Sequence, residues 1–258
     1  MKISIVTVTY NSGSVLSNCL NSVFNQSHSD VEQVLIDGAS TDNTLDIVRA
    51  NHSRVATIVS EPDNGIYDAL NKGIDRSSGD IIGLLHADDV FSDSFVLAEV
   101  DNVFNQFPEA DVIIGNVIFR DSVNKSCVTR KYNSSRFRPW MLRFGFMPAH
   151  TATFIRKSVF ERIGFYNADY ISAGDFEFFV RIFLRHRIKP VFLDQTLVFM
   201  SIGGLSTSGW KSHSRTTIEI LRALREHGIY SNFFFVLARL PIKLIDQIIF
   251  RIRYNFNF

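Results

Sequence analysis

The first half of the chain alternates between two hydrophobic patterns. Short runs of β-branched and other apolar residues are typical of strands buried on both faces, and the segments between them repeat apolar residues every three or four positions, as amphipathic helices do. The predicted strands span residues 3–10, 31–40, 54–63, 79–89 and 110–121, and the predicted helices span residues 11–26, 41–51, 65–77 and 94–108. This alternation predicts an α/β fold, an open and mostly parallel sheet with helices on both faces.

The pattern loosens in the second half of the chain. Residues 120–139 are polar and basic without a helical period, which predicts a hairpin or a loop, and residues 146–167 predict a short strand followed by a helix that ends at Gly164. Residues 172–188 predict one strong helix, and residues 190–207 predict a strand, a turn, a second strand and a glycine-rich loop.

Charge sets the C-terminal part apart. The 258-residue chain is 46% hydrophobic, enough to bury a sizeable core, and its net charge of +1 indicates no partner. Residues 211–258, however, carry eight Lys/Arg against three Asp/Glu and predict two or more helices. We therefore expect a first α/β half (1–118), a second half of the same domain (119–210) and a basic helical tail (211–258).

The arginines of this tail alternate with long apolar runs, which suits an anionic membrane surface better than a nucleic acid. The alternative is a tail that simply packs on the domain. No run of 18 uncharged apolar residues is present, so we expect no spanning helix.

The expected location is cytoplasmic. Cys19 and Cys127 form no CxxC pair and no disulfide framework, which favours reduced thiols. The N-terminus enters a strand almost at once and lacks the apolar region of a signal peptide.

Polar side chains follow each of the first four predicted strands. These strand ends are residues 7–11, 37–42, 61–65 and 86–89, and they are rich in carboxylates. In open α/β sheets, ligands bind beyond the carboxyl ends of the strands. We therefore expect the four ends to converge on one rim that holds the functional site.

The fourth strand end combines His86, Asp88 and Asp89 after an apolar run. Divalent cations such as Mg²⁺ and Mn²⁺ need oxygen ligands, and one or two protein carboxylates together with substrate phosphates suffice. A solvated loop that leads into a helix cap explains the same three residues equally well.

The other candidates also allow two interpretations. Asp37 is suited to accept hydrogen bonds from a base or ribose, or to form an ordinary strand–turn–helix connection. Tyr67 and Asn71 face one side of a predicted helix and fit either a ligand or solvent. Asp175, in the first turn of a helix, is either a cap or a general base, and His150 beside an apolar strand is a satisfied side chain or a ligand contact.

Several nucleotide-binding and hydrolase motifs are absent from the sequence. No GxGxxG follows the first strand, and there is no GxxxxGK[ST], HExxH or GxSxG. The sequence therefore does not favour a dinucleotide-binding or P-loop protein.

Taken in order, these segments resemble one family, the inverting family 2 glycosyltransferases, which have the Rossmann-like GT-A fold. Among them the chain is similar to bacterial enzymes that build O-antigen, capsule or other exopolysaccharide. The resemblance covers roughly residues 1–210 and lies in "SIVTVTYNS", "LIDGASTDNT", "SEPDNGIYDALNKGI", "GLLHADDVF", "HTATFIRKSVFERIGFYN", "AGDFEFFVRI" and "GGLST".

The resemblance implies roles for individual residues. Those expected to bind the nucleotide-sugar are Thr7, Thr9, Tyr10, Asn11, Asp37, Ser40, Asp42, Gly65, Tyr67, Asn71, His86, Ala87 and Asp88. Asp88 is implied as the principal ligand of a divalent metal, Mn²⁺ or Mg²⁺, with Asp89 as a further metal residue. His86 replaces the usual first acid of a DxD motif.

The same resemblance places Asp175 at the catalytic base, with Gly174 in place of the acid that usually precedes it. It also places His150, Gly203 and Gly204 near the acceptor or the diphosphate.

The resemblance implies an inverting transfer. A sugar passes from a nucleotide-diphosphate sugar, with UDP favoured, to a hydroxyl of a glycan or of a polyprenyl-diphosphate-linked acceptor at the inner face of the cell membrane.

Two alternatives remain. A nucleotidyltransferase would carry a cationic glycine-rich loop after the first strand, whereas "TYNSGS" has no cation. A non-catalytic, membrane-associated binder of sugar nucleotides would not need Asp175.

Overall fold

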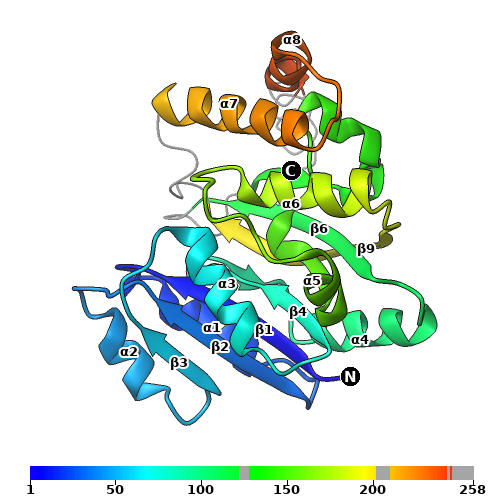
Figure 1. The fold of residues 1–258 in the computed structure, drawn as a ribbon. Coiled ribbons are helices and arrows are strands. Elements are labelled where there is room, and N and C mark those ends of the chain that lie inside the picture. Colours follow the sequence, from blue (N-terminus) through cyan, green and yellow to red (C-terminus); the bar gives the residue numbers. More distant parts are fainter. Residues whose placement is uncertain (122–127, 202–209, 243–244, 246–258) are drawn as a thin grey trace, which may run out of the picture.

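The computed structural model describes residues 1–121, 128–201, 210–242 and 245, and its centre is one mixed sheet (Figure 1). In the described residues the sheet has nine strands in the order β3-β2-β1-β4-β8-β6-β9-β5, and β7 pairs with β6 outside this path. The strands are β1 (Ile3–Thr9), β2 (Val31–Asp37), β3 (Thr57–Ser60), β4 (Ile81–Leu84), β5 (Val90–Phe91), β6 (Val112–Arg120), β7 (Val128–Tyr132), β8 (Thr153–Arg156) and β9 (Val191–Ser201).

Most of the strands run in one direction. β3, β2, β1 and β4 are mutually parallel, and β6 and β9 share their direction because β8 is antiparallel to both β4 and β6. β5, β7 and β8 run the opposite way. The predicted α/β class with a mostly parallel sheet is confirmed. The antiparallel pairing of β7 with β6 favours the hairpin over the loop, the two forms predicted for residues 120–139.

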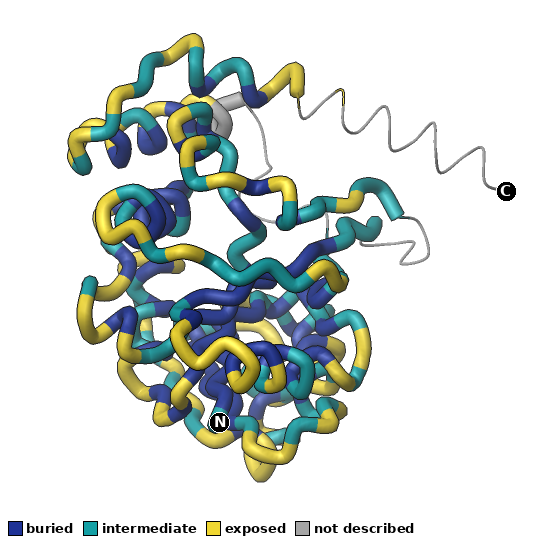
Figure 2. The backbone as a smooth tube through the Cα atoms, turned by 90° about the vertical axis from the view of Figure 1, so that its right-hand side faces the viewer, coloured by how far each residue is buried: buried dark blue, intermediate teal, exposed yellow. Residues whose placement is uncertain are grey.

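Helices cover both faces of the sheet. They are α1 (Leu16–Phe24), α2 (Thr44–Ala50), α3 (Ile66–Arg76), α4 (Val96–Gln106), α5 (Lys157–Ile163), α6 (Gly174–Val180), α7 (Trp210–Glu226) and α8 (Phe233–Leu237). α3, α5 and α6 share one core with one face of the sheet, and α1 and α4 share another core with the opposite face. Figure 2 shows buried segments of the backbone in the interior and exposed segments around them.

The C-terminal helices extend the first of these cores. Ile220, Ala223 and Leu224 of α7 and Val236 of α8 are all buried in it. α7 and α8 therefore lie above α6 in Figure 1 as part of the folded body. In the described part of the chain, no helix combines the length and the apolarity that a bilayer crossing requires.

Two expectations about the second half were wrong. Residues 191–201 form the single strand β9, where a strand, a turn and a second strand were predicted, because a bulge absorbs the polar interruption. Asn116 of β6 donates a hydrogen bond to Asp194 there (2.9 Å) and holds the bulge against its neighbour. The one helix predicted at 172–188 is α6 followed by a π-helical turn, Arg181–Arg185.

Candidate active site

The register of the parallel strands brings the polar strand ends together. Thr9 of β1 pairs with Asp37 of β2, and Asp37 pairs with Ser60 of β3. Asp37 is fully buried, and its carboxylate accepts hydrogen bonds from the Ser40 N–H (3.0 Å) and the Ser60 hydroxyl (2.7 Å). The carboxylate therefore fixes the geometry of the rim at the end of β2.

The loops after β1 and β2 are bonded to each other. The backbone N–H of Asn11 donates to the Ser40 hydroxyl (2.8 Å), and the Asn11 side chain accepts from the Thr41 N–H (2.9 Å). Asn11 and Ala39 both adopt positive φ, 48° and 60°, a conformation that costs non-glycine residues about 1–3 kcal/mol each. Such strain at a strand end is typical of functional sites.

Tyr10 lies on this rim with 60% of its surface exposed. Gly38 lies so close to it that an added Cβ would be 3.5 Å from the Tyr10 ring and 2.6 Å from a carboxylate oxygen of Asp63. The ends of the first three strands therefore meet, as the sequence predicted.

Other predicted residues serve the framework. Thr7 is fully buried and accepts a hydrogen bond from Gln33 (3.1 Å), whereas the buried Thr9 hydroxyl has no partner among the described residues. Asp42 accepts hydrogen bonds from the backbone N–H groups of Gly13 (3.1 Å) and Thr44 (2.9 Å). Its hydrogen bonds from Thr44 lower the pKa of Asp42, which keeps it ionised as a cap.

α3 carries the next group of predicted residues. Gly65 precedes it at φ 110°, a conformation that favours glycine. Asn71 bonds both backbone groups of Tyr166, donating to its C=O (2.8 Å) and accepting from its N–H (2.9 Å). Asn71 therefore fixes Tyr166 against α3.

Tyr67 of α3 joins the rim to Asp175 of α6. Its hydroxyl donates a hydrogen bond to an Asp175 carboxylate oxygen (3.1 Å), which also accepts from the backbone N–H of Phe176 (2.8 Å). Burial raises the pKa of Asp175 to about 6, and the hydrogen bonds from Phe176 and Tyr67 oppose the rise. A carboxylate with such a pKa is suited to take a proton near neutral pH.

Steric crowding explains why the residue before Asp175 is a glycine. A Cβ on Gly174 would lie 2.8–2.9 Å from atoms of the Tyr67 ring. Any larger residue would displace the ring that holds Asp175. The presence of Gly174, where the family resemblance implies an acid, is therefore linked to the packing of Tyr67.

An aromatic row connects this carboxylate to the turn after β4. The Tyr67 and Tyr166 rings are stacked with centroids 6.0 Å apart, and the Tyr166 hydroxyl shares a hydrogen bond with His150 Nε2 (2.9 Å). His150 lies against His86, with centroids 5.9 Å apart. Burial and the charge of His86 lower the pKa of His150 to about 3, so its ring is neutral at pH 7.

The turn itself presents Asp88 and buries Asp89. The Ser201 hydroxyl donates to the Asp88 carbonyl (2.8 Å), and the Ser201 N–H donates to one carboxylate oxygen of Asp89 (3.2 Å). Asp89 is only 2% exposed, so burial and the charge of Asp88 raise its pKa well above the usual range. Asp88 is half-buried on the rim, next to Ala87, which is buried beneath it.

The described residues fit a metal only in part. They contain no group of three or more His, Cys, Asp or Glu side chains arranged as a metal site. Asp88 offers one carboxylate, and the second oxygen of Asp89 is buried without a hydrogen-bond partner among these residues. Mg²⁺ and Mn²⁺ are often held by one or two carboxylates plus substrate phosphates, so Asp88 fits a metal shared with a diphosphate. Gly203 and Gly204 lie outside the described residues.

Glu219 of α7 is a further residue of the site that was not predicted from the sequence. Its buried carboxylate accepts three backbone N–H groups, from Ile171 (3.1 Å), Ser172 (2.8 Å) and Ala173 (2.8 Å), in the loop that leads into α6. Its charge also contributes to the raised pKa of Asp175. The sequence feature that could have indicated this role is an acidic residue next to the apolar face of α7.

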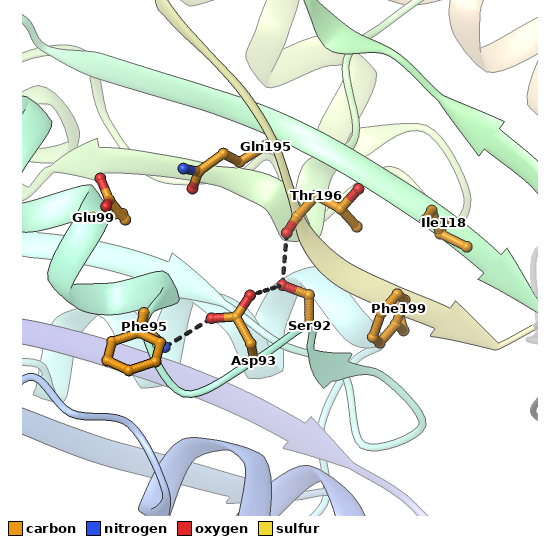
Figure 3. Close-up of a pocket in the computed structure, with 8 residues that line it drawn as sticks. All are labelled: Ser92, Asp93, Phe95, Glu99, Ile118, Gln195, Thr196 and Phe199. Atoms are coloured by element: carbon orange, nitrogen blue, oxygen red, sulfur yellow. Dashed lines mark hydrogen bonds between the residues drawn. The ribbon is translucent and has the colours of Figure 1, made fainter.

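A hollow of about 600 Å³ has a separate set of lining residues (Figure 3). It is lined by Ser92, Asp93, Phe95, Glu99, Ile118, Gln195, Thr196 and Phe199. Ser92 donates a hydrogen bond to the Thr196 carbonyl (2.6 Å), and the carboxylate of Asp93 caps the N–H of Phe95 (2.8 Å). None of the predicted site residues lines this hollow, so the candidate site is the rim itself.

Fold and site together define an α/β protein whose polar groups gather at the carboxyl edge of its sheet, with Asp175 supplied by a second element. The sequence model of Glycosyl transferase family 2 matches residues 4–164. A "PGL/p-HBAD biosynthesis glycosyltransferase" of Mycobacterium bovis (strain BCG / Pasteur 1173P2) is 32% identical over 209 residues, which cover 80% of this chain and 79% of that protein. The chain therefore belongs to glycosyl transferase family 2.

Solved structures share the fold. The structure of Staphylococcus aureus TarS 1–349 in complex with UDP-GlcNAc matches with a TM-score of 0.66 at 18% identity, over 87% of this chain and 66% of that one. The mannosyltransferase PcManGT from Pyrobaculum calidifontis, in complex with GDP-Man and Mn²⁺, matches with a TM-score of 0.65 at 17% identity, over 87% and 63%. The chain spans 40% of a longer TarS chain. The GT-A architecture expected from the sequence is confirmed.

Proposed function

We propose that this chain is an inverting glycosyltransferase in which Asp175 is the general base. The observation that carries the proposal is the Tyr67–Asp175 hydrogen bond, which holds a carboxylate of pKa about 6 beside the rim. An acceptor hydroxyl would lose its proton to Asp175 as its oxygen attacks the anomeric carbon from the side opposite the leaving diphosphate. A single displacement of this kind inverts the anomeric configuration.

The donor would be a nucleotide-diphosphate sugar bound along the rim. Tyr10 and Asn11 would contact the nucleoside, with Asp37, Ser40 and Asp42 shaping the loop around it. TarS binds UDP and UDP-GlcNAc and PcManGT binds GDP-Man, which supports a nucleotide-sugar. We propose UDP as the first nucleotide to test.

Asp88 would hold Mn²⁺ or Mg²⁺ together with the diphosphate oxygens, with His86 beside it. The metal would offset the negative charge that develops on the departing diphosphate. Asp89 is buried and bonded to Ser201, which favours a supporting role over direct ligation. The Mn²⁺ in the PcManGT complex supports the choice of metal.

The acceptor would be a hydroxyl of a glycan or of a lipid-linked glycan in the synthesis of a bacterial surface polysaccharide. The mycobacterial relative is named for PGL/p-HBAD biosynthesis, which supports a role in a biosynthetic glycosyl transfer. In this proposal residues 1–118 bind the nucleotide-sugar, residues 119–210 supply the base and the acceptor side, and the cytoplasmic enzyme works at the inner face of the membrane.

A thermal-shift panel of nucleoside diphosphates, with and without Mn²⁺, tests the donor and the metal together. We expect one nucleotide to raise the melting temperature, and Mn²⁺ to increase that shift. Stabilisation by none of them, in either condition, would contradict the proposal.

The reaction products distinguish the alternatives. A glycosyltransferase releases a nucleoside diphosphate from the donor, a nucleotidyltransferase releases pyrophosphate from a nucleoside triphosphate, and a non-catalytic binder releases neither. Proton NMR of the glycosidic product then reports whether the anomeric configuration was inverted.

A further inference from the structure

Exposed aromatic side chains gather where α8 packs against the 3₁₀ helix Pro139–Phe144. We call this the aromatic–basic surface. Its aromatic members are Trp140, Phe144, Tyr230, Phe233, Phe234 and Phe235. Trp140 is 59% exposed, Tyr230 70% and Phe234 80%, values far above those of side chains that stabilise a core.

The surface is continuous although its two segments lie about ninety residues apart in the chain. The Phe144 ring touches Trp140 on one side (centroids 5.9 Å apart) and stacks on Phe235 on the other (4.8 Å). Tyr230 meets the edge of Phe235 (6.3 Å). The Ser231 hydroxyl donates to the Arg143 carbonyl (2.6 Å) and ties the two segments together.

The surface is also held rigidly on the body of the protein. Val236 of α8 is fully buried, and the Asn232 side chain caps α8 by accepting from the Phe235 N–H (3.0 Å). Arg239, nearly buried, lies within 3.5 Å of the Gly145 carbonyl and 3.3 Å of the Thr217 hydroxyl. The exposed rings therefore project from a fixed platform.

The charged side chains within the two segments that carry these rings have one sign. Residues 128–144 contain five Lys/Arg and no Asp or Glu, and residues 230–242 contain no acid either. Arg136, Arg138 and Arg143 are exposed and lie within four residues of Trp140 in the chain. These two segments therefore combine apolar rings with cations and contain no carboxylate side chain.

We propose that the aromatic–basic surface docks the protein on an anionic lipid membrane. Aromatic rings favour the level of the lipid headgroups, and each cation near an anionic leaflet adds about 1 kcal/mol, or about fivefold in partitioning. A second copy of the chain fits less well, because a two-fold interface would place the same cations against each other. An anionic membrane supplies an apolar layer that receives the aromatic rings and negative charge that attracts the cations.

Docking would bring the folded body that carries the candidate base to the membrane, where a lipid-linked acceptor would lie; this consequence rests on the proposed function. α8 packs on α7, and Glu219 of α7 holds the loop that precedes Asp175. The membrane surface and the candidate base are therefore joined through one helix. Membrane binding itself requires no nucleotide and is tested without it.

Flotation of the full chain with phosphatidylcholine vesicles, with and without phosphatidylglycerol, tests the proposal. We expect binding only to the anionic vesicles, weakening as salt is raised. Replacing Arg136 and Arg143 together by Gln should lower the partition coefficient about 25-fold, and the Trp140→Ser/Phe234→Ser double variant at least about tenfold.

Matched controls change equally exposed residues elsewhere. Phe95→Ser removes an exposed aromatic ring at the hollow of Figure 3, and Arg49→Gln removes an exposed cation on α2. Both should bind vesicles as the unchanged protein does. A Trp210→Phe variant leaves Trp140 as the only tryptophan, and brominated lipids should quench its fluorescence.

Three results would overturn the proposal. These are equal binding to neutral and anionic vesicles, full binding by both double variants, or a change of oligomeric state in those variants without loss of vesicle binding. Nucleoside diphosphate binding is measured in the same samples. Vesicle binding without nucleotide binding would count against the proposed function alone, and the reverse would count against the surface alone.

Discussion

The hydrogen bond from Tyr67 to Asp175 gives the sharpest test of the candidate site. The hydroxyl donates to the ionised carboxylate and lowers its pKa, against the larger opposite effect of burial. Tyr67→Phe removes this donor while keeping the ring that packs on Gly174. The pKa of Asp175 should therefore rise above its value of about 6.

The size of the rise follows from the energy of the lost bond. A hydrogen bond to a charged group contributes about 1.5–3 kcal/mol, and one pKa unit corresponds to about 1.36 kcal/mol. The pKa of Asp175 should move up by about one to two units. A base works only when deprotonated, so activity is lost as pH falls through this pKa. The variant should lose about twofold to tenfold at pH 7 and little at pH 9.

The assay is the pH profile of kcat/KM for donor turnover, measured for both proteins. Tyr132→Phe is the matched control, because the Tyr132 hydroxyl is bonded to the Met147 carbonyl (2.8 Å) and not to Asp175. The control should keep the acid limb of the unchanged protein. An acid limb that does not move in Tyr67→Phe would refute the assignment of Asp175 as the base held by Tyr67.

Three further changes test other parts of the account. Glu219→Gln removes a negative charge that raises the pKa of Asp175, so the acid limb of the variant's pH profile should move to lower pH. The kcat should also fall, because the backbone N–H groups of the loop before α6 lose the carboxylate that accepts from them. A shift of the acid limb to higher pH would contradict this. Asp88→Asn should abolish the effect of Mn²⁺ on nucleoside diphosphate binding in a thermal-shift assay, and an undiminished Mn²⁺ effect would exclude Asp88 as the ligand. Phe178→Ala empties a fully buried site against Tyr166 and should lower the free energy of unfolding in urea by about 3–5 kcal/mol; a loss below about 1 kcal/mol would show that the site collapses.

The first half of the fold was predictable because its hydrophobic periods are unambiguous. β1 is rich in β-branched residues, β2 contains the apolar run Val34–Ile36, and turn residues follow both; α1 and α3 have clear apolar faces. Parallel register then places their polar ends on one rim without further information. The position of β8 between β4 and β6 was not predictable, because a strand of four residues does not specify its neighbours.

The site was predictable only in part for a related reason. Residue types indicated Asp88 and Asp175, but burial separates Asp88 on the rim from Asp89 inside the fold. Asn71 was predicted to border the nucleotide, and the structure shows its amide bonded to the Tyr166 backbone. The role of Glu219 depends on the docking of α7 on α6, which local sequence does not encode.

The central claim is that Asp175 takes the proton from the acceptor. The direct measurement compares Asp175→Asn with the unchanged protein for sugar transfer from the preferred donor to a lipid extract of the source cells, with nucleotide affinity determined in parallel. We predict that transfer falls about 10²–10⁴-fold while nucleotide affinity stays the same. Transfer by Asp175→Asn at the rate of the unchanged protein would contradict the account.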